Sequence, residues 1–259
     1  MSQSIIGRVL LANGCWVLCS AFLLAQGTAT PTKPKEPAKE TGKSATKPAP
    51  TSDATKAVPA ADKWEASIAK IEANLAKQKP AADRWVFTGS SSITKWKLDQ
   101  SFPKYNVLNH GFGGSQMSDV VRYFDRIITP AKPQIVVLYS GDNDTAGKKT
   151  PQMVADDTRK IVEMLKRNLP QTRLVVIGVK PSIKRWALRD KQIETNDLLK
   201  KLIAEQKSPL YKFIDLGPVL LDSAGQPDKE NYLGDDLHLS DKGYALWVEK
   251  LLPVLTRTK

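Results

Sequence analysis

Five short apolar runs alternate along the chain with longer segments whose apolar residues recur at helical spacing. The runs lie at residues 85–87, 106–108, 135–139, 174–177 and 213–214, and the helical patterns cover 64–75, 117–128, 154–165, 190–206 and 244–255. Short buried strands that alternate with helices are typical of a parallel sheet with helices on both faces. The sequence therefore predicts an α/β fold built on a five-stranded parallel sheet.

Polar and glycine-rich stretches stand where such a sheet is expected to bind a ligand. In open parallel sheets, ligands bind beyond the carboxyl ends of the strands. Three of the stretches follow the first three predicted strands and the fourth precedes the last helix: 89–93, 109–115, 140–144 and 235–239. Each alone has an ordinary explanation, such as a helix cap or a turn. Their shared position at one edge of the sheet indicates a functional site.

The residue types in these stretches favour acyl transfer by a serine. A serine hydroxyl is a weak nucleophile and needs an adjacent base. The chain has only two histidines, His110 and His238, and imidazole acts as a base near neutral pH. Asp235 precedes His238 by three residues, a spacing that puts both side chains on one side of a helical turn or tight loop. We therefore expect His238 to be the base with Asp235 as its partner, and His110 to be structural.

Acyl transfer also needs donors that stabilise the oxyanion of the tetrahedral intermediate. The candidates are the backbone amides of Ser91 and Gly114 and the side chain of Asn143. Glycine at position 114 lets the backbone approach a substrate closely because it has no Cβ. Two histidines and two cysteines are a poor inventory for zinc, and we expect neither a metal nor a cofactor.

Taken together, the four stretches resemble the SGNH hydrolases, the GDSL-type esterases and lipases, over about residues 84–256. Gly89-Ser90-Ser91 is similar to the family's first block, with Ser91 as the nucleophile. Gly114 and Asn143 match the oxyanion glycine and asparagine, and Asp235 with His238 matches the final Asp-x-x-His. Residues 178–181 and 189–196 resemble the platelet-activating-factor acetylhydrolase branch. The resemblance implies a flavodoxin-like three-layer sandwich and a hydrolase that acts on carboxylic esters without a cofactor.

One position departs from the family pattern. Ser90 stands where the first block usually has an aspartate, which leaves three adjacent serines. The resemblance selects Ser91 as the nucleophile, with Ser90 and Ser92 as the alternatives. Ile93 occupies the place of the second glycine in the Gly-x-Ser-x-Gly elbow, so the pattern of the α/β-hydrolases is not met.

The first 62 residues differ in composition from the rest of the chain. Residues 1–27 carry a single charge, Arg8, then an apolar stretch and small residues, the layout of a secretory signal peptide; an uncleaved anchor is the alternative. Residues 28–62 are rich in Pro, Lys, Ala and Thr and lack aromatics, which predicts a disordered linker. We expect a hydrolase domain at 63–259 that acts outside the cytoplasm, secreted, periplasmic or tethered through the N-terminus to a membrane or wall.

The formal net charge of +12 favours anionic partners. The charges are scattered and no basic–aromatic motif of the single-strand binders is present, so we expect no nucleic-acid binding. Residues 180–191 concentrate five basic residues around Trp186. They predict either a loop that borders the site and receives an anionic or sugar-bearing part of the substrate, or a solvated basic loop.

The natural substrate stays open within this family, from lipid esters and acylated glycans to thioesters and small acyl esters. Two other functions compete with ester hydrolysis. A flavodoxin-like sheet can bind a nucleotide or flavin at the same edge, but the turn at 111–114 lacks the phosphate-loop pattern. A non-catalytic module that binds glycan or wall material is the main alternative, and the intact Ser91, Asp235 and His238 argue against it.

Overall fold

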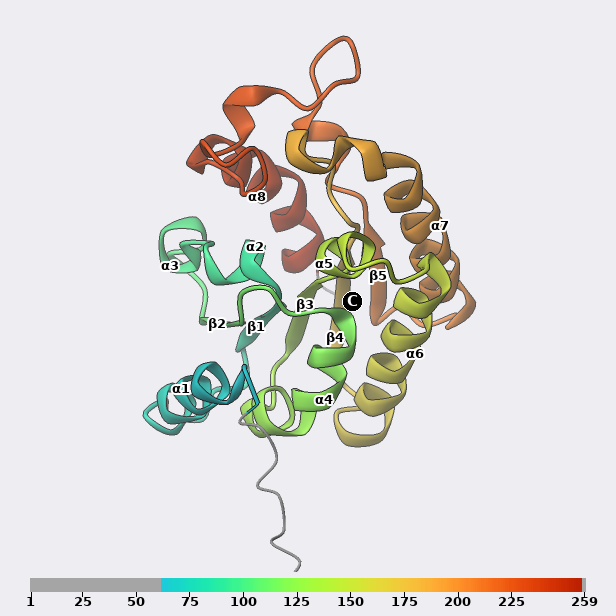
Figure 1. Cartoon of the computed structure of the whole chain (residues 1–259). Coiled ribbons are helices and arrows are strands. Elements are labelled where there is room, and N and C mark those ends of the chain that lie inside the picture. The colour runs from blue at the N-terminus through green and yellow to red at the C-terminus, as the bar shows by residue number, and fades with distance from the viewer. Residues whose placement is uncertain (1–61, 258–259) are drawn as a thin grey trace, which may run out of the picture. The chain divides into compact units, whose positions relative to one another are not determined.

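A computed structural model describes residues 62–257 and centres on a five-stranded parallel sheet (Figure 1). The strands are β1 (Trp85–Gly89), β2 (Val107–Gly111), β3 (Ile135–Tyr139), β4 (Arg173–Ile177) and β5 (Tyr211–Ile214). Their spatial order is β2-β1-β3-β4-β5, and every neighbouring pair runs parallel. This is the flavodoxin-like order, so the predicted α/β class, strand number and winding are confirmed.

Helices cover both faces of the sheet and complete the three layers (Figure 1). One face packs against α1 (Glu65–Ala76), α4 (Met117–Ile127), α6 (Pro151–Asn168) and α7 (Arg189–Glu205). The other face packs against α2 (Ser91–Thr94), α3 (Leu98–Ser101) and α8 (Asp241–Thr256). The shorter elements are α5 (Asp142–Ala146), η1 (Thr129–Ala131), η2 (Ile183–Leu188), η3 (Pro218–Leu220) and η4 (Lys229–Asn231).

Alternation along each strand divides its side chains between the two layers of helices. In β3, Val136 and Leu138 pack in the core that includes α4 and α6, whereas Ile135, Val137 and Tyr139 pack in the core that includes α8. All five side chains are buried, which explains why this central strand reads as a continuous apolar run. Burial on both faces gives the loops at the sheet edge a rigid support.

The carboxyl ends of β1 and β3 approach each other closely, at the point where the strand order reverses. Gly89 ends β1 with a φ of +129°, and a Cβ atom there would lie 1.8 Å from the Tyr139 carbonyl oxygen. Only glycine fits such a backbone. The chain then turns at once into Ser90 and Ser91, at the switch point where sheets of this kind bind their ligands.

The predicted signal peptide at 1–27 lies outside the described residues, as does the predicted linker at 28–62 apart from Asp62. Between residues 62 and 257, no helix combines the length and the apolar character needed to cross a membrane.

Candidate active site

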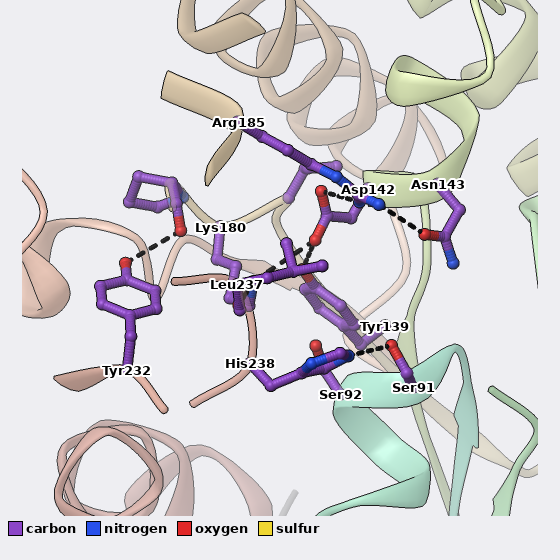
Figure 2. A network of polar contacts seen from close by, with 12 residues as sticks. Ser91, Ser92, Tyr139, Asp142, Asn143, Lys180, Arg185, Tyr232, Leu237 and His238 are labelled. Carbon is purple, nitrogen blue, oxygen red and sulfur yellow. Dashed lines mark hydrogen bonds and ion pairs between the residues drawn. The ribbon is translucent and has the colours of Figure 1, made fainter. Parts of the chain in front are cut away.

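Ser91, His238 and Asp235 lie together at the carboxyl edge of the sheet. Ser91 is the first residue of α2, directly after β1, and His238 lies in the loop before α8. The Nε2 atom of His238 is 2.9 Å from Ser91 Oγ, and the Nδ1 atom is 2.5 Å from Asp235 Oδ2. Figure 2 shows the ring of His238 facing Ser91. Residues 147 positions apart in the sequence are thus in hydrogen-bond contact.

The Asp-x-x-His spacing forms a turn in which one carboxylate holds both the backbone and the ring. Asp235 Oδ1 accepts hydrogen bonds from the amides of Leu237 (3.1 Å) and His238 (3.0 Å), which leaves Oδ2 for the ring. Partial burial opposes the ionisation of Asp235. The hydrogen bonds from the His238 ring and from the two amides outweigh it and hold the pKa of this carboxyl well below its usual range. Asp235 is therefore a carboxylate at neutral pH, and His238 Nδ1 donates to it.

The three adjacent serines differ in exposure and in contacts. Ser90 and Ser92 are each 2% exposed, whereas Ser91 is half-buried and carries the hydrogen bond to His238. Ser90 supports the first turn of α2 with its backbone, because its carbonyl accepts from the amides of Ile93 and Thr94. This geometry favours Ser91 as the nucleophile over both alternatives.

The three predicted oxyanion donors come from three neighbouring segments. The Ser91 amide begins α2, Gly114 lies in the turn after β2, and Asn143 lies in α5 after β3. In the described part of the chain, the amides of Ser91 and Gly114 donate to no protein acceptor. Asn143 Nδ2 donates to the Ser115 carbonyl (3.0 Å), which ties it to the glycine turn and leaves its second hydrogen available. The turn abuts the nucleophile, since a Cβ on Gly113 would lie 3.7 Å from Ser91 Cβ.

The first helix of the domain helps to hold this glycine turn. Gly114 has a φ of +79°, a backbone conformation that other residues rarely adopt, and a Cβ there would lie 3.2 Å from Trp64 Cη2. Trp64 directly precedes α1 and packs edge-on against Phe112, with 5.7 Å between the ring centroids. The sequence pattern placed Trp64 on the apolar face of a helix but gave no sign of this contact with the candidate site.

The second histidine is held inside the protein. His110 lies in β2, is 3% exposed, and donates from Nδ1 to the Ile127 carbonyl at 2.6 Å. Burial lowers the pKa of His110 to about 4, although its hydrogen bond to Ile127 opposes the shift. A neutral, buried imidazole with a backbone partner fits the structural role predicted for it.

The burial of His110 should make folding stability depend on pH. An unfolded histidine binds a proton below a pH of about 6.5, whereas folded His110 stays neutral down to about pH 4. Protons therefore favour the unfolded chain between these values. The free energy of unfolding should fall by about 3 kcal/mol as the pH drops through this window.

Urea unfolding of wild type and His110→Asn, near neutral pH and at about pH 4.5, measures this effect. Asparagine retains a donor for the Ile127 carbonyl but does not titrate, so the variant should lose less stability on acidification than wild type. Its ester hydrolysis near neutral pH should persist. An equal decline in both proteins would contradict the role of His110.

The basic loop at 180–191 borders the site, but two of its cations form ion pairs with a buried carboxylate. Lys180 is fully buried, and its Nζ atom lies 3.3 Å from Asp142 Oδ2. Arg185 donates to Asp142 Oδ1 (2.6 Å) and to Asn143 Oδ1 (3.1 Å). Our prediction of a loop that either receives a substrate anion or is solvated is therefore wrong for these two residues, because both neutralise Asp142.

The site lies at an open edge of the sheet. A cavity of about 750 Å³ is lined by residues of α1, η1 and the segment before β1. Neither this cavity nor four further ones within residues 62–257 is lined by Ser91 or His238. Over the same residues, no group of three or more His, Cys, Asp or Glu side chains is placed to hold a metal ion.

Known proteins share the sequence pattern of this chain. The model of the GDSL-like lipase/acylhydrolase family matches residues 80–246. Human platelet-activating factor acetylhydrolase IB subunit alpha1 is 28% identical over 221 residues, which cover 82% of this chain and 90% of that protein. The mouse alpha2 subunit is 26% identical over 192 residues, which cover 71% of this chain and 80% of that protein.

Solved structures share its fold. A GDSL-like lipase from Bacteroides thetaiotaomicron matches with a TM-score of 0.62 and 17% identity, over 73% of this chain and 96% of that chain. A catalytic mutant of an acetylxylan esterase from Geobacillus stearothermophilus matches with a TM-score of 0.56 and 15% identity, over 70% of this chain and 100% of that chain. At these identities the likeness concerns the fold alone.

Proposed function

The chain belongs to the GDSL-like lipase/acylhydrolase family and hydrolyses ester bonds, and we propose that it does so with a triad of Ser91, His238 and Asp235. Ser91 is the nucleophile, His238 the general base, and Asp235 the carboxylate that orients the ring. The observation that carries this proposal is the pair of contacts on His238, 2.9 Å to Ser91 Oγ and 2.5 Å to Asp235 Oδ2. Such triads are recognised by their geometry, whatever their positions in the sequence.

The contacts of His238 support the following direction for each proton transfer. As Ser91 Oγ attacks the ester carbonyl carbon, its proton passes to His238 Nε2 and the carbonyl π electrons move onto oxygen. Asp235 keeps the proton on Nδ1, which leaves Nε2 free to accept, and stabilises the imidazolium that forms. When the tetrahedral intermediate collapses, Nε2 returns the proton to the departing alcohol oxygen. Water then attacks the acyl-enzyme by the same sequence and regenerates Ser91.

The oxyanion is stabilised by the amides of Ser91 and Gly114 and by Asn143 Nδ2. All three donors belong to segments that meet at the end of β1, which supports a preorganised oxyanion hole. Donors of this kind act on charge that develops only in the transition state, and they therefore raise kcat more than they lower KM.

We propose that the acyl group of the substrate is short. Two of the similar proteins, a platelet-activating factor acetylhydrolase and an acetylxylan esterase, carry the acetyl group in their names. Ser91 lines none of the cavities described above, which supports an acyl group that needs no large enclosed pocket. The alcohol part of the ester, lipid or glycan, would then lie along the open edge of the sheet.

We also propose that the enzyme acts outside the cytoplasm. Support comes from the signal-like layout of residues 1–27, which contain both cysteines, Cys15 and Cys19. A chain cleaved after this segment has no cysteine and needs no disulfide, which suits an oxidising compartment. Fractionation of cells that express the full chain, compared with cells that express residues 28–259, tests this location.

A serine-reactive fluorophosphonate probe and a series of p-nitrophenyl esters test the activity. We expect the probe to label the wild-type chain and hydrolysis to decline as the acyl chain lengthens from acetate to octanoate. A non-catalytic glycan-binding module would bind acetylated glycans without labelling or turnover, and this result would overturn the proposal. If the enzyme prefers octanoate, the proposal of a short acyl group is wrong, but the proposal of ester hydrolysis by the triad stands.

A further inference from the structure

A buried ion cluster formed by Asp142, Lys180 and Arg185 lies against the proposed site (Figure 2). The side chain of Lys180 is 0% exposed, that of Asp142 6% and that of Arg185 18%. Asp142 accepts from Lys180 Nζ at 3.3 Å and from Arg185 Nη1 at 2.6 Å. The Tyr139 hydroxyl lies 3.5 Å from the same carboxylate. Two segments about 40 residues apart in the sequence, the end of β3 and the loop after β4, therefore meet at one carboxylate.

The charge of this cluster is not explained by stability alone. Removing ions from water is costly, so a buried ion cluster is weak evidence for stabilisation. Burial opposes the ionisation of Asp142, but Lys180 and Arg185 outweigh it and hold the pKa of this carboxyl below its usual range. The Arg185 guanidinium thus places a positive charge next to Asn143, on the side of the site where the oxyanion forms.

Arg185 and the Ser115 carbonyl together set the orientation of the Asn143 amide. Arg185 Nη2 donates to Asn143 Oδ1 at 3.1 Å, and Asn143 Nδ2 donates to the Ser115 carbonyl at 3.0 Å. A flipped amide would turn its NH₂ group toward the guanidinium and its oxygen toward the carbonyl, so both contacts would become repulsive. The guanidinium also polarises the amide, which makes Nδ2 a stronger donor.

Lys180 connects the carboxylate of Asp142 to the loop that carries His238. Its Nζ atom donates to the Leu237 carbonyl at 2.8 Å as well as to Asp142, and Leu237 directly precedes His238. Beside Lys180, the Pro181 carbonyl accepts a hydrogen bond from the Tyr232 hydroxyl at 2.9 Å. These contacts hold the ion cluster against the loop that carries His238. Arg185 is therefore fixed in the position from which it donates to Asn143.

We propose that Arg185 is a positioning residue: held by Asp142 and Lys180, it orients and polarises the Asn143 amide toward the oxyanion. This inference rests on the proposed function of Ser91 and of the oxyanion donors. A residue that acts in this way affects turnover only while the Asn143 amide is present. That dependence separates positioning from a general contribution to the fold.

The test is a double-mutant cycle on Arg185 and Asn143 in the full chain, with p-nitrophenyl acetate as substrate. We expect Asn143→Ala to lower kcat about 10²- to 10³-fold with little change in KM. Arg185→Met should lower kcat about 10- to 100-fold in the wild-type background, and less than about threefold in the Asn143→Ala background. Arg185→Lys keeps the charge but not both prongs of the contact, and its kcat should lie between those of wild type and Arg185→Met.

Lys184→Met is the matched control, because Lys184 precedes Arg185 in the same loop, carries the same charge and is exposed. Its kcat should equal that of wild type. Three results would overturn the positioning role: an equal fold-decrease in kcat for Arg185→Met in both backgrounds, an unchanged kcat, or an effect of Arg185→Met that is confined to a higher KM. If Arg185→Met shows no cooperative urea transition, the same cycle with Arg185→Lys decides between these outcomes.

Ser91→Ala separates the failure of this inference from the failure of the proposed function. Wild-type turnover by Ser91→Ala would overturn the triad and the role of Arg185 with it. An inactive Ser91→Ala, beside Arg185 variants whose effects add to those of Asn143→Ala, would overturn the positioning role alone.

Discussion

Ser91→Ala should remove nearly all ester hydrolysis and leave the fold intact. The substitution exchanges one hydroxyl for hydrogen on a half-buried side chain, so little packing is lost, and the only side-chain hydrogen bond removed is the one to His238 Nε2. Without Oγ no acyl-enzyme can form. Triad knockouts lower kcat by about 10⁴ to 10⁶. The measurements are kcat for p-nitrophenyl acetate, fluorophosphonate labelling, and the urea midpoint as a check on folding.

Ser90→Ala and Ser92→Ala are the controls for this result. Both serines are buried, and among the described residues neither forms a hydrogen bond with His238. Both substitutions should keep turnover within an order of magnitude of wild type. Activity that survives in Ser91→Ala but disappears in Ser90→Ala would move the nucleophile by one residue. Labelling by fluorophosphonate that persists in Ser91→Ala would have the same meaning.

The sequence predicted the sheet chiefly through its central strands β1, β3 and β4, which are buried on both faces, whereas β2 and β5 are partly exposed. A strand such as Ile135–Tyr139, covered by helices on each side, is a short run of apolar and β-branched residues, and the Ser-Gly that follows it marks where the strand ends. The Asp-x-x-His pair was equally readable, because its geometry is local: the carboxylate of Asp235 caps the backbone of the turn that presents His238. A pattern formed by residues that are close together in the sequence can be recognised from the sequence alone.

The ion cluster was not predicted, because its members come from two separate loops, one after β3 and one after β4. Asp142 belonged to the polar stretch at 140–144, and Lys180 and Arg185 to a basic loop. Composition records how many charges a segment has but not which of them pair across 38 or 43 positions. The contact of Trp64 with the glycine turn is long-range in the same way. The short helices α2 and α5 were also missed, because four or five residues are too few to show a helical period.

Asp235→Asn should lower kcat by about 10⁴ while the turn around His238 persists. The remaining Oδ1 still accepts from the amides of Leu237 and His238, so the loop keeps its shape. An NH₂ group in place of Oδ2 would donate to Nδ1 and force the ring proton onto Nε2. That tautomer cannot accept the Ser91 proton, and the imidazolium loses its carboxylate partner. We therefore expect the loss in kcat, with KM for p-nitrophenyl acetate nearly unchanged and fluorophosphonate labelling slowed in proportion.

Asp236→Asn is the control one residue away. Asp236 has a φ of +60°, which asparagine tolerates, and it pairs with the exposed Lys229 rather than with His238. Asp236→Asn takes away the same charge from the same turn. Because an exposed ion pair contributes little to stability and Asp236 does not pair with the His238 ring, turnover should stay within about twofold of wild type. If Asp235→Asn and Asp236→Asn slow the enzyme equally, the net charge of the loop matters and the ring tautomer does not. If Asp235→Asn keeps wild-type turnover while Ser91→Ala is inactive, Asp235 is not needed for catalysis and the catalytic group is a Ser91–His238 dyad.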